Sequence, residues 1–542
     1  MSLLKLRHHA SRLIGIGLST LLLSACGLVP VKTLEQTLQP KTSIAEGNAV
    51  IVVKVQMGQG SFLPAHLKWQ GLNITEVTDG ASKARSQASI NVEPVYAEHS
   101  LFVAEIPAGK WRLSGVSTMQ FNGDGSSISY GFPLSSAGTF SVKAGELVEL
   151  GSIAILPTGK SVESGNRNER RTQQRMVAMI VPLSPAERAQ LLQIVSPRLP
   201  ASLKLREEPS WELSPLQKLL AEPAFRQGES KRFASPLIQN GEALFGEEFG
   251  QIRIRRGGQW DWMDTGLSGN VSAIARMDDG TLLAGGALGV VLFKRPGGNT
   301  WESRPLPARD AVIAGLHAHP KIGVIAAVRH GPELIVWSMK SLDAPWTELR
   351  RFSASGNSNF GTAVNVQTSI GNKRFYARVN EVAFTADSNL HVLDIESGQW
   401  STTSLSMYDN LHQPPGDTIW SLRGNAFSAG VRVTSDAGKT WQELASTGLP
   451  LALQMTSPTT GYLVRSEAFV VKASSVVFLL LKTTDGGKTF TQIAKLPTHF
   501  TRIFETAPNE LVALSADNRV FLSKDGGLSW SEDGMESSES KS

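Results

Sequence analysis

Short apolar segments separated by polar turns recur along the C-terminal half of the chain. The segments Val271–Met277, Thr281–Ala287 and Gly289–Lys294 are typical of strands, and Trp301 follows them. A large aromatic residue follows each such group, at successive spacings of 41, 45, 54, 41, 49 and 40 residues. These aromatic residues are Trp260, Trp301, Trp346, Trp400, Trp441, Phe490 and Trp530. The period predicts seven repeats of a four-stranded unit, and six or eight also fit because the middle copies are weak.

Three repeats share the pattern Ser/Thr-x-Asp-x-Gly-x-Thr/Ser-Trp/Phe directly after a strand. Its residues are Thr434, Asp436, Gly438 and Trp441, then Thr483, Asp485, Gly487 and Phe490, then Ser523, Asp525, Gly527 and Trp530. We expect the Asp to accept hydrogen bonds from backbone N–H groups two or three residues further on and the Gly to supply a positive φ. The aromatic residue is expected to anchor the next strand against a neighbouring sheet. Turn geometry and packing therefore explain every position.

The motif resembles the Asp-box, or BNR repeat, of sialidase-like β-propellers. The resemblance implies a seven-bladed β-propeller over residues 235–533. Similar propellers include glycoside hydrolases, and also photosystem II assembly factors and sortilin-type receptors that lack catalytic residues. The resemblance therefore implies either hydrolysis of a glycan or binding of a protein or glycan partner, and the fold does not decide between them.

A sialidase-like enzyme would need an Arg triad, a Tyr activated by a Glu, an acidic Asp and a Phe/Tyr-Arg-Ile-Pro segment. The nearest segment, Gln251–Arg256, has Arg-Ile but neither the aromatic residue nor the Pro. Tyr376 has basic neighbours and no adjacent Glu, since Glu381 is five residues further on. We therefore expect a non-enzymatic binding propeller, with a sialidase-like glycoside hydrolase as the alternative.

Histidines near residue 320 are the candidate metal ligands. His317 and His319 share one face of an extended segment, and His330 follows in the same repeat. No Cys and no patterned Asp or Glu completes a site there, so we expect no metal. No phosphate-binding Gly loop precedes a helix, so we expect no cofactor.

The N-terminal half alternates apolar and polar residues between frequent turns over residues 49–157. Short strands with turns about every 8–12 residues predict a β-sandwich, similar to the prealbumin-like domains of bacterial envelope proteins. Residues 158–234 become polar and then helical, with capping sequences at Ser184 and Ser214, and predict a linker before the propeller. Residues 534–542 are polar and predict a disordered tail.

The N-terminus carries an export signal. Basic residues precede the apolar run Leu13–Leu23, which is too short to span a bilayer and ends in Leu-Ser-Ala-Cys26. This ending resembles the bacterial lipobox, so we expect removal of residues 1–25, lipidation of Cys26 and a tether over residues 26–48. Cys26 is the only Cys among 542 residues, which excludes internal disulfides. Gly27, in place of Asp, favours the outer membrane.

Charge gives no sign of nucleic-acid binding. Removal of the signal takes away Lys5, Arg7 and Arg12 and no acid, which lowers the formal charge from +5 to +2. The pI of about 9.1 therefore partly reflects a segment that is cut off. The expected partners are the membrane, through the N-terminal lipid, and an envelope protein or glycan, with no nucleic acid.

Overall fold

The structure is a computed structural model, and it describes most of the chain. The described residues are 33–57, 69–77, 89–92, 100–121, 127–134, 137–164, 171–207, 211–222, 236–353, 365–380, 388–405, 409–412, 416–424, 429–446, 448–467, 476–516 and 519–533. The predicted signal (1–25), the lipidation site Cys26 and the tail (534–542) lie outside them. Within the described ranges, no helix is long and apolar enough to cross a membrane.

In the N-terminal unit, defined here as residues 33–222, the described residues form two sheets, three short α-helices and one 3-10 helix. Its strands are β1 (Asn48–Met57), β2 (Gly71–Glu76), β3 (Ser89–Val92), β4 (Leu101–Pro107), β5 (Gly109–Phe121), β6 (Ser127–Pro133), β7 (Thr139–Val142), β8 (Glu146–Ser164), β9 (Arg171–Val181), β10 (Lys204–Leu205) and β11 (Trp211–Glu212). Its helices are α2 (Leu34–Thr37), α3 (Pro185–Val195) and α4 (Pro215–Leu220), with the 3-10 helix η3 (Ser196–Arg198). One sheet has the order β10-β8-β1-β4 with β9 beside β8, and the other has the order β11-β7-β5-β2-β3 with β6 beside β5.

Alternate residues of β1 belong to two different apolar cores. Ile51 and Val53 pack in the core that both N-terminal sheets share, together with Trp111. Val50 and Val52 point to the other side of the strand, where they pack with residues of the C-terminal sheets. The period of two along a strand produces this division. β1 is therefore buried on both faces.

The segment predicted as a linker, residues 158–234, is largely built into the N-terminal unit. β8 continues through residue 157 and pairs with β9 from Ser152↔Val181 to Ser164↔Arg171. α3 begins with a capping box at Ser184, as the sequence predicts, while β10 and β11 each extend one sheet. The predicted boundary at residue 157 is thus wrong, because pairing with strands distant in sequence decides where this unit ends.

The predicted tether, residues 26–48, is structured from Thr33 onward. Thr33 and Gln36 form the capping box of α2. Leu34 and Leu38 are buried in the core that joins the two halves of the molecule. The prediction of a free tether up to residue 48 is therefore wrong, because these apolar side chains pack against the folded body.

Seven four-stranded antiparallel sheets follow one another along the described residues from 237 to 532. The first sheet contains β12 (Leu237–Gln239), β13 (Glu242–Gly246), β14 (Gln251–Arg256) and β15 (Gln259–Asp264). The second contains β16 (Ala273–Arg276), β17 (Leu282–Gly285), β18 (Val291–Lys294) and β19 (Glu302–Ser303). The third contains β20 (Val312–His319), β21 (Gly323–His330), β22 (Glu333–Met339) and β23 (Thr347–Ser353). The fourth and fifth sheets contain β24 (Asn365–Ile370), β25 (Arg374–Asn380), β26 (Ser388–Asp394) and β27 (Trp400–Leu405); β28 (Asp409–His412), β29 (Ile419–Gly424), β30 (Ala429–Thr434) and β31 (Gln442–Ser446). The sixth and seventh sheets contain β32 (Leu449–Met455), β33 (Gly461–Ser466), β34 (Phe478–Thr483) and β35 (Thr491–Leu496); β36 (Phe500–Ala507), β37 (Glu510–Ser515), β38 (Val520–Ser523) and β39 (Ser531–Glu532). Such consecutive four-stranded sheets are typical of a β-propeller, and the protein is mainly β, as predicted.

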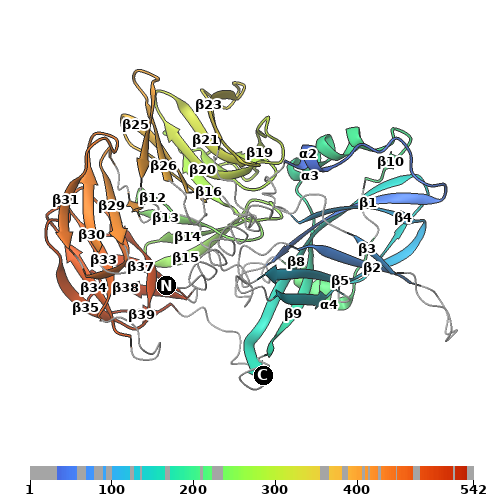
Figure 1. The fold of residues 1–542 in the computed structure, drawn as a ribbon, viewed down its shortest axis with the longest axis horizontal. Helices are drawn as coiled ribbons and strands as arrows, with labels where there is room; N and C mark the ends of the chain where they lie inside the picture. Colours follow the sequence, from blue (N-terminus) through green and yellow to red (C-terminus); the bar gives the residue numbers. More distant parts are fainter. Residues whose placement is uncertain are drawn as a thin grey trace, which may run out of the picture.

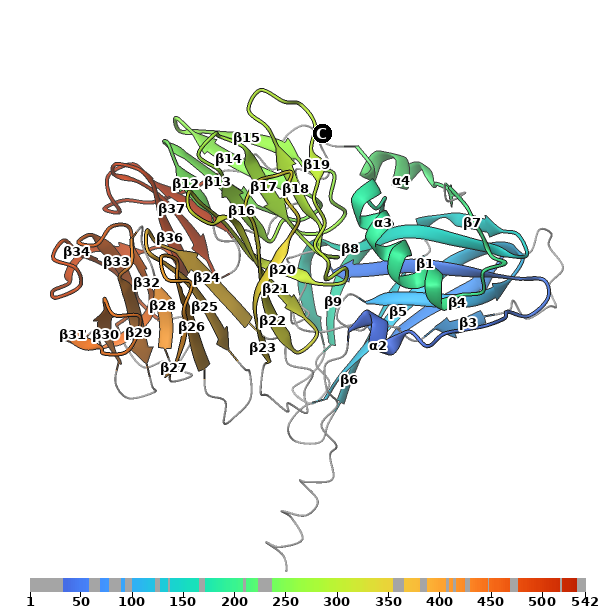
Figure 2. The ribbon, with the colours of Figure 1, turned by 90° about the horizontal axis from the view of Figure 1, so that it is seen from above.

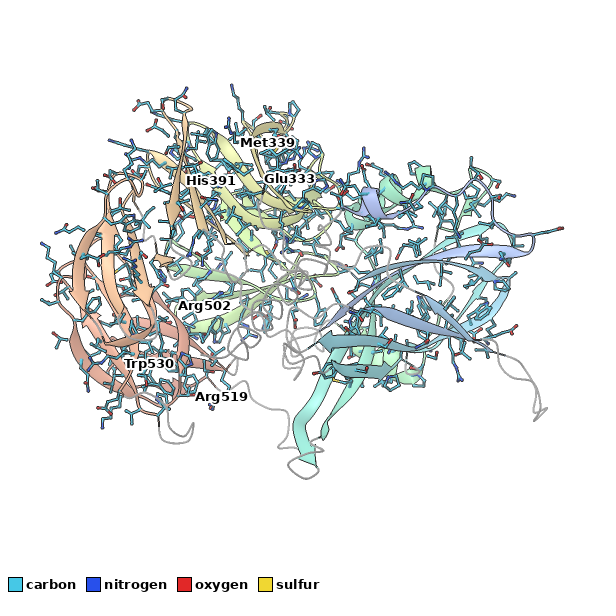
Figure 3. The ribbon with its side chains drawn as sticks, viewed as in Figure 1. Glu333, Met339, His391, Arg502, Arg519 and Trp530 are labelled. Carbon is cyan, nitrogen blue, oxygen red and sulfur yellow. The ribbon has the colours of Figure 1, made fainter. Side chains whose placement is uncertain are left out.

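Apolar clusters join each of these sheets to the next. Ala327 of the third sheet packs with Phe375 of the fourth, and Leu390 of the fourth packs with Ile419 of the fifth. The first and seventh sheets are also in contact, because the rings of Phe245 and Phe504 lie 6.0 Å apart. Half-buried aromatic residues lie at the edges of these clusters: Trp260, Trp301, Trp346, Trp400, Trp441, Phe490 and Trp530, the last labelled in Figure 3.

The N-terminal unit packs directly on the propeller. In Figures 1 and 2 its blue-to-green strands lie beside the first propeller sheets, with α2 and α3 close to the contact. One apolar cluster contains Val52 of β1 together with Ile252 and Leu288 of the first two sheets. Glu187 of α3, which is buried, accepts hydrogen bonds from the N–H and the hydroxyl of Ser268 at 2.9 and 2.8 Å. The two halves therefore share one continuous core.

Candidate functional site

The three motif turns have one hydrogen-bond pattern. In the first turn, Asp436 Oδ1 accepts the N–H of Thr440 at 2.9 Å, and Oδ2 accepts the Thr440 hydroxyl at 2.6 Å. Thr434 Oγ1 accepts the N–H groups of Asp436 and Gly438 and donates to Asp436 Oδ1. The two later turns repeat every one of these bonds. The side chain of the Ser or Thr that opens the motif and the side chain of the Asp therefore hold each turn together.

The predicted role of the Asp needs one correction. Its backbone donor lies four residues further on, rather than two or three, because the Ser or Thr that opens the motif takes the nearer N–H groups. The hydrogen bonds from Thr440, side chain first, lower the pKa of Asp436 to about 2, and those from Ser529 lower the pKa of Asp525 to about 2. These carboxylates are ionised and already occupied, so they serve the turn rather than a substrate.

The residues considered for sialidase-like chemistry have structural partners. The hydroxyl of Tyr376 donates to the carbonyl of Asp417 at 2.9 Å, and burial raises its pKa to about 12. The Arg-Ile segment lies on β14, where Arg253 pairs with the buried Glu247 at 2.8 Å and lies 4.4 Å from the ring centroid of Trp262. A protonated phenol and an arginine in a buried ion pair are poorly suited to attack or to hold a glycan carboxylate.

The three histidines of the third sheet have separate partners. His317 Nε2 lies 2.8 Å from Thr368 Oγ1, His319 Nε2 lies 3.0 Å from a backbone carbonyl, and His330 Nε2 lies 2.6 Å from Asp310 Oδ1. Residue 315 is Gly because a Cβ there would lie 1.8 Å from Thr368 Oγ1. Burial lowers the pKa of His317 to about 4, which keeps it neutral. Within the described ranges, no group of three or more His, Cys, Asp or Glu could hold a metal.

Arginines recur near the C-terminal ends of the second strands in four consecutive sheets. They are Arg329 of β21, Arg378 of β25, Arg423 of β29 and Arg465 of β33, and we call them the arginine row. Because every sheet is an antiparallel meander, its second strand runs in the same direction as those of its neighbours. The row therefore lies on one face of the propeller, which we call the arginine face. The motif turns follow the third strands, which end on the opposite face, here called the box face.

Two members of the row border the seam between the fourth and fifth sheets from opposite sides. Arg378 shares a strand face with Tyr376, and Arg423 shares one with Ile419; both of these apolar neighbours belong to the cluster that fills the seam. Arg378 is buried and donates from Nε to Ser388 Oγ at 2.8 Å. The side chain of Arg423 is exposed and has no hydrogen bond or ion pair within the described residues. Of the two guanidinium groups that border this seam, one is buried and bonded and the other is exposed.

The N-terminal unit covers the first two sheets on the arginine face. Phe249, which follows β13, packs with residues of β8, β9 and α4, and Leu288 and Val290, which follow β17, pack with residues of β1 and α3. These loops lie at the same end of the sheets as the arginine row. The first two sheets are therefore covered there, while the row begins at the third.

The arginine row was not predicted from the sequence. Their spacing could have indicated the row, because the four arginines are separated by 49, 45 and 42 residues, which is similar to the period of the aromatic anchors. The spacing alone did not show that they share a strand end, since that depends on the strand boundaries.

No protein-family model and no curated protein matches this chain. Solved structures that resemble it include YCF48 from Cyanidioschyzon merolae, with 14% identity and a TM-score of 0.38 over 54% of this chain and 94% of that one. A structure of YCF48 bound to D1 peptide has 13% identity and a TM-score of 0.35 over 48% and 79%. The GH74 xyloglucanase from Xanthomonas campestris has 13% identity and a TM-score of 0.36 over 55% and 53%. Likenesses this distant carry no argument about function, which rests on this chain's own residues.

Proposed function

We propose that the protein is a non-enzymatic, lipid-anchored lipoprotein of the bacterial envelope whose propeller binds an acidic segment of a protein partner. The observation that carries this proposal is the arginine row. An arginine side chain offers five N–H donors in a planar fork that matches a carboxylate. Within the row, the exposed side chain of Arg423 offers such a fork to a carboxylate of an extended acidic segment, and the half-buried Arg329 and Arg465 extend the positive charge along the same face.

The architecture belongs to the same proposal. We infer a closed seven-bladed propeller over residues 236–533, supported by the seven consecutive sheets and by the contact of Phe245 with Phe504. We infer a prealbumin-like β-sandwich in the N-terminal unit, supported by a core to which both of its sheets contribute. Aromatic anchors and Asp-box turns then account for the regular spacing of the blades.

Anchoring through Cys26 gives the first prediction. Cys26→Ser removes the thiol that a lipid modifies, so the variant is expected to remain uncleaved or to leave the membrane fraction. Intact mass of the mature protein and detergent-phase partitioning test this. A mature N-terminus at any residue other than Cys26 would contradict the proposal, as would a variant that is cleaved normally and still partitions as the wild type does.

The anchor would attach on the side of the arginine face. Thr33 follows Cys26 by seven positions, so an extended chain reaches at most about 25 Å. The N–H of Leu34 donates to Asp310 Oδ2 at 2.6 Å, and Asp310 also contacts His330, the neighbour of Arg329. A lipid on Cys26 would therefore hold the start of the row close to the bilayer. A membrane-associated partner, in the outer membrane if Gly27 acts as expected, fits this geometry.

A sialidase-like glycoside hydrolase is the alternative. It would need two free carboxylates about 5–10 Å apart. Asp436, Asp485 and Asp525 are occupied by their turns, and Glu187 and Glu247 are occupied by Ser268 and Arg253. These contacts make the five carboxylates poor candidates for a hydrolytic pair.

Charge reversal in the row gives the second prediction. Arg423→Glu is expected to reduce capture of the protein partner in crosslinked envelopes at least tenfold, because a carboxylate now faces the acidic segment. Lys439→Glu is the matched control: it makes the same charge change at an exposed position on the box face. Quantitative mass spectrometry of the crosslinked material measures the capture.

Two results would contradict the proposed function. One is equal loss of capture in both charge-reversal variants. The other is turnover of fluorogenic glycosides or sialosides that a single carboxylate substitution abolishes while the fold stays intact.

A further inference from the structure

A groove of about 770 Å³ separates the third and fourth sheets on the box face, and the proposed function does not use it. The third sheet contributes Ile322, Leu349 and Arg350 to its walls. The fourth sheet contributes the turn at residues 395–399 and the ring of Trp400. β21 begins beside this groove and ends in the arginine row, so the two sites lie at opposite ends of the sheets.

The motif turn of the fourth sheet, which borders the groove, is irregular. In the regular turns the glycine packs on the preceding sheet: a methyl group at Gly438 would lie 3.2 Å from Leu390, and one at Gly527 would lie 2.8 Å from Leu480. At Gly398, in the corresponding turn of the fourth sheet, a methyl group would meet nothing within 4 Å. The regular turns thus close the space between sheets, whereas this one leaves it open.

Trp400, like Trp441, differs from the other tryptophan anchors in its hydrogen bonding. The indole N–H groups of Trp301, Trp346 and Trp530 each donate to a backbone carbonyl at 3.0 or 3.1 Å. The indole N–H of Trp400 has no acceptor within the described residues. Phe352 meets the Trp400 ring edge-on at 5.2 Å, so the indole is held firmly by packing.

Further polar groups around the groove are uncommitted. The side chains of Arg350 and Gln399 are exposed and have no hydrogen-bond partner within the described residues. The carboxylate of Glu396 lies 3.4 Å from the ammonium group of the exposed Lys321 at the rim. Phe352, in the wall behind, stacks on His391, which is labelled in Figure 3, at a centroid distance of 3.7 Å. Burial, together with the charge of Arg350, lowers the pKa of His391 to about 4, so this imidazole stays neutral.

We propose that this groove binds a saccharide unit of an envelope glycan, with the sugar ring against Trp400 and its hydroxyl groups on Arg350, Glu396 and Gln399. A sugar hydroxyl both donates and accepts hydrogen bonds, so it matches a site that offers N–H donors beside a carboxylate and an amide oxygen. The apolar face of the ring matches the indole and the aliphatic floor. The volume lies within the range of about 300–1,000 Å³ typical of small-ligand sites.

The test uses the full-length protein in a detergent without a sugar headgroup. Saturation-transfer NMR and calorimetry are carried out with cellohexaose, chitohexaose, mannohexaose and lipopolysaccharide core oligosaccharide. We expect at least one to bind, with fivefold or greater weakening in Gln399→Ala and in Trp400→Phe, which keeps the ring but removes the indole N–H. Ser397→Trp, which fills the groove from an exposed turn position, is expected to abolish binding.

Lys439→Ala, in the regular turn of the fifth sheet, is the matched control and is expected to bind as the wild type does. Arg423→Glu is also expected to keep saccharide binding, which separates this site from the arginine row. Absence of binding by all four oligosaccharides at about 5 mM would overturn the proposal. Undiminished binding by Ser397→Trp would overturn it as well, because the saccharide would then lie elsewhere.

Discussion

At the scale of single residues, the side chains fall into those whose hydrogen-bonding capacity is already used and those whose capacity is free. Asp436 belongs to the first kind, because a hydroxyl and a backbone N–H of Thr440 saturate its carboxylate. Arg423 belongs to the second kind. An acidic side chain in a motif turn is therefore a structural group, and an unpaired guanidinium at a strand end is the better candidate for contact with a partner.

The third prediction concerns Asp436→Ala. The substitution leaves the N–H and hydroxyl of Thr440 without their acceptor, so the melting temperature is expected to fall at pH 7. The pKa of Asp436 is lowered to about 2. Its charge-dependent stabilisation is thus complete above the ordinary pKa near 4 and is lost as the pH falls towards 2.

The difference in melting temperature between wild type and Asp436→Ala should therefore shrink between pH 4 and pH 2, as measured by scanning calorimetry. Ser435→Ala, an exposed neighbour in the same turn, is the control and should change little. A difference that stays constant over this pH range would show that the carboxylate charge is not what stabilises the turn.

At the scale of elements, α2 shows how a four-residue helix becomes fixed. Such a short helix is not stable alone. Its capping box, the buried Leu34 and the bond from the Leu34 N–H to Asp310 hold it against the propeller. Asp310 also binds His330, so an ionisable pair lies directly under the helix.

The fourth prediction is a pH dependence of α2 docking. Burial and the charge of Arg351 lower the pKa of His330. The hydrogen bond to Asp310 and the negative charges of Asp310 and Glu333 raise it by more, so the pKa of His330 is raised overall. Because the pKa is raised, protonated His330 stabilises the folded state. This stabilisation is complete below the ordinary histidine pKa near 6.5 and is lost as the pH rises through the pKa of His330 in the folded protein. The charged group on α2 itself is Glu35, whose carboxylate lies 3.8 Å from the guanidinium of Arg198.

Hydrogen exchange of residues 33–38 tests this, after correction for the intrinsic rate at each pH. Protection is expected to be higher at pH 6 than at pH 8 in the wild type, and the change should be smaller in His330→Gln. An equal pH dependence in the two proteins would exclude His330 as its source.

At the scale of the whole molecule, the N-terminal unit and the propeller share apolar and polar contacts. β1 supplies side chains to the cores on both of its faces, and Glu187 bonds to Ser268 across the contact. Cutting the chain between the two halves would leave these contacts in place. The molecule is therefore expected to behave as one cooperative body.

The fifth prediction is a single unfolding transition for the mature protein in scanning calorimetry. Proteolytic fragments from cleavage between residues 222 and 236 should co-elute in gel filtration without denaturant. Val52→Asp, which places a carboxylate in the shared core, should lower the melting temperature of the whole protein. Two resolved transitions in the wild type would contradict the shared core.

The sequence by itself determined the features that depend on residues close in the chain. The motif turn is specified by Thr434, Asp436 and Gly438, whose hydrogen bonds span two to four residues. Likewise, α3 begins at the predicted cap, Ser184. The period of the aromatic residues likewise indicated repeated four-stranded units. Local hydrogen bonding and strand periodicity act over a few residues, so they can be predicted without knowing the partners.

Only the tertiary structure decided the features that depend on distant partners. The apolar sequence of β1 did not show that Val50 and Val52 would pack against the propeller. The polar sequence after residue 157 did not show that it forms the paired strands β8 and β9. The arginine row and the groove beside Trp400 also arise only when separate sheets stand side by side. Contacts between residues far apart in the chain depend on the assembled packing, which no local pattern specifies.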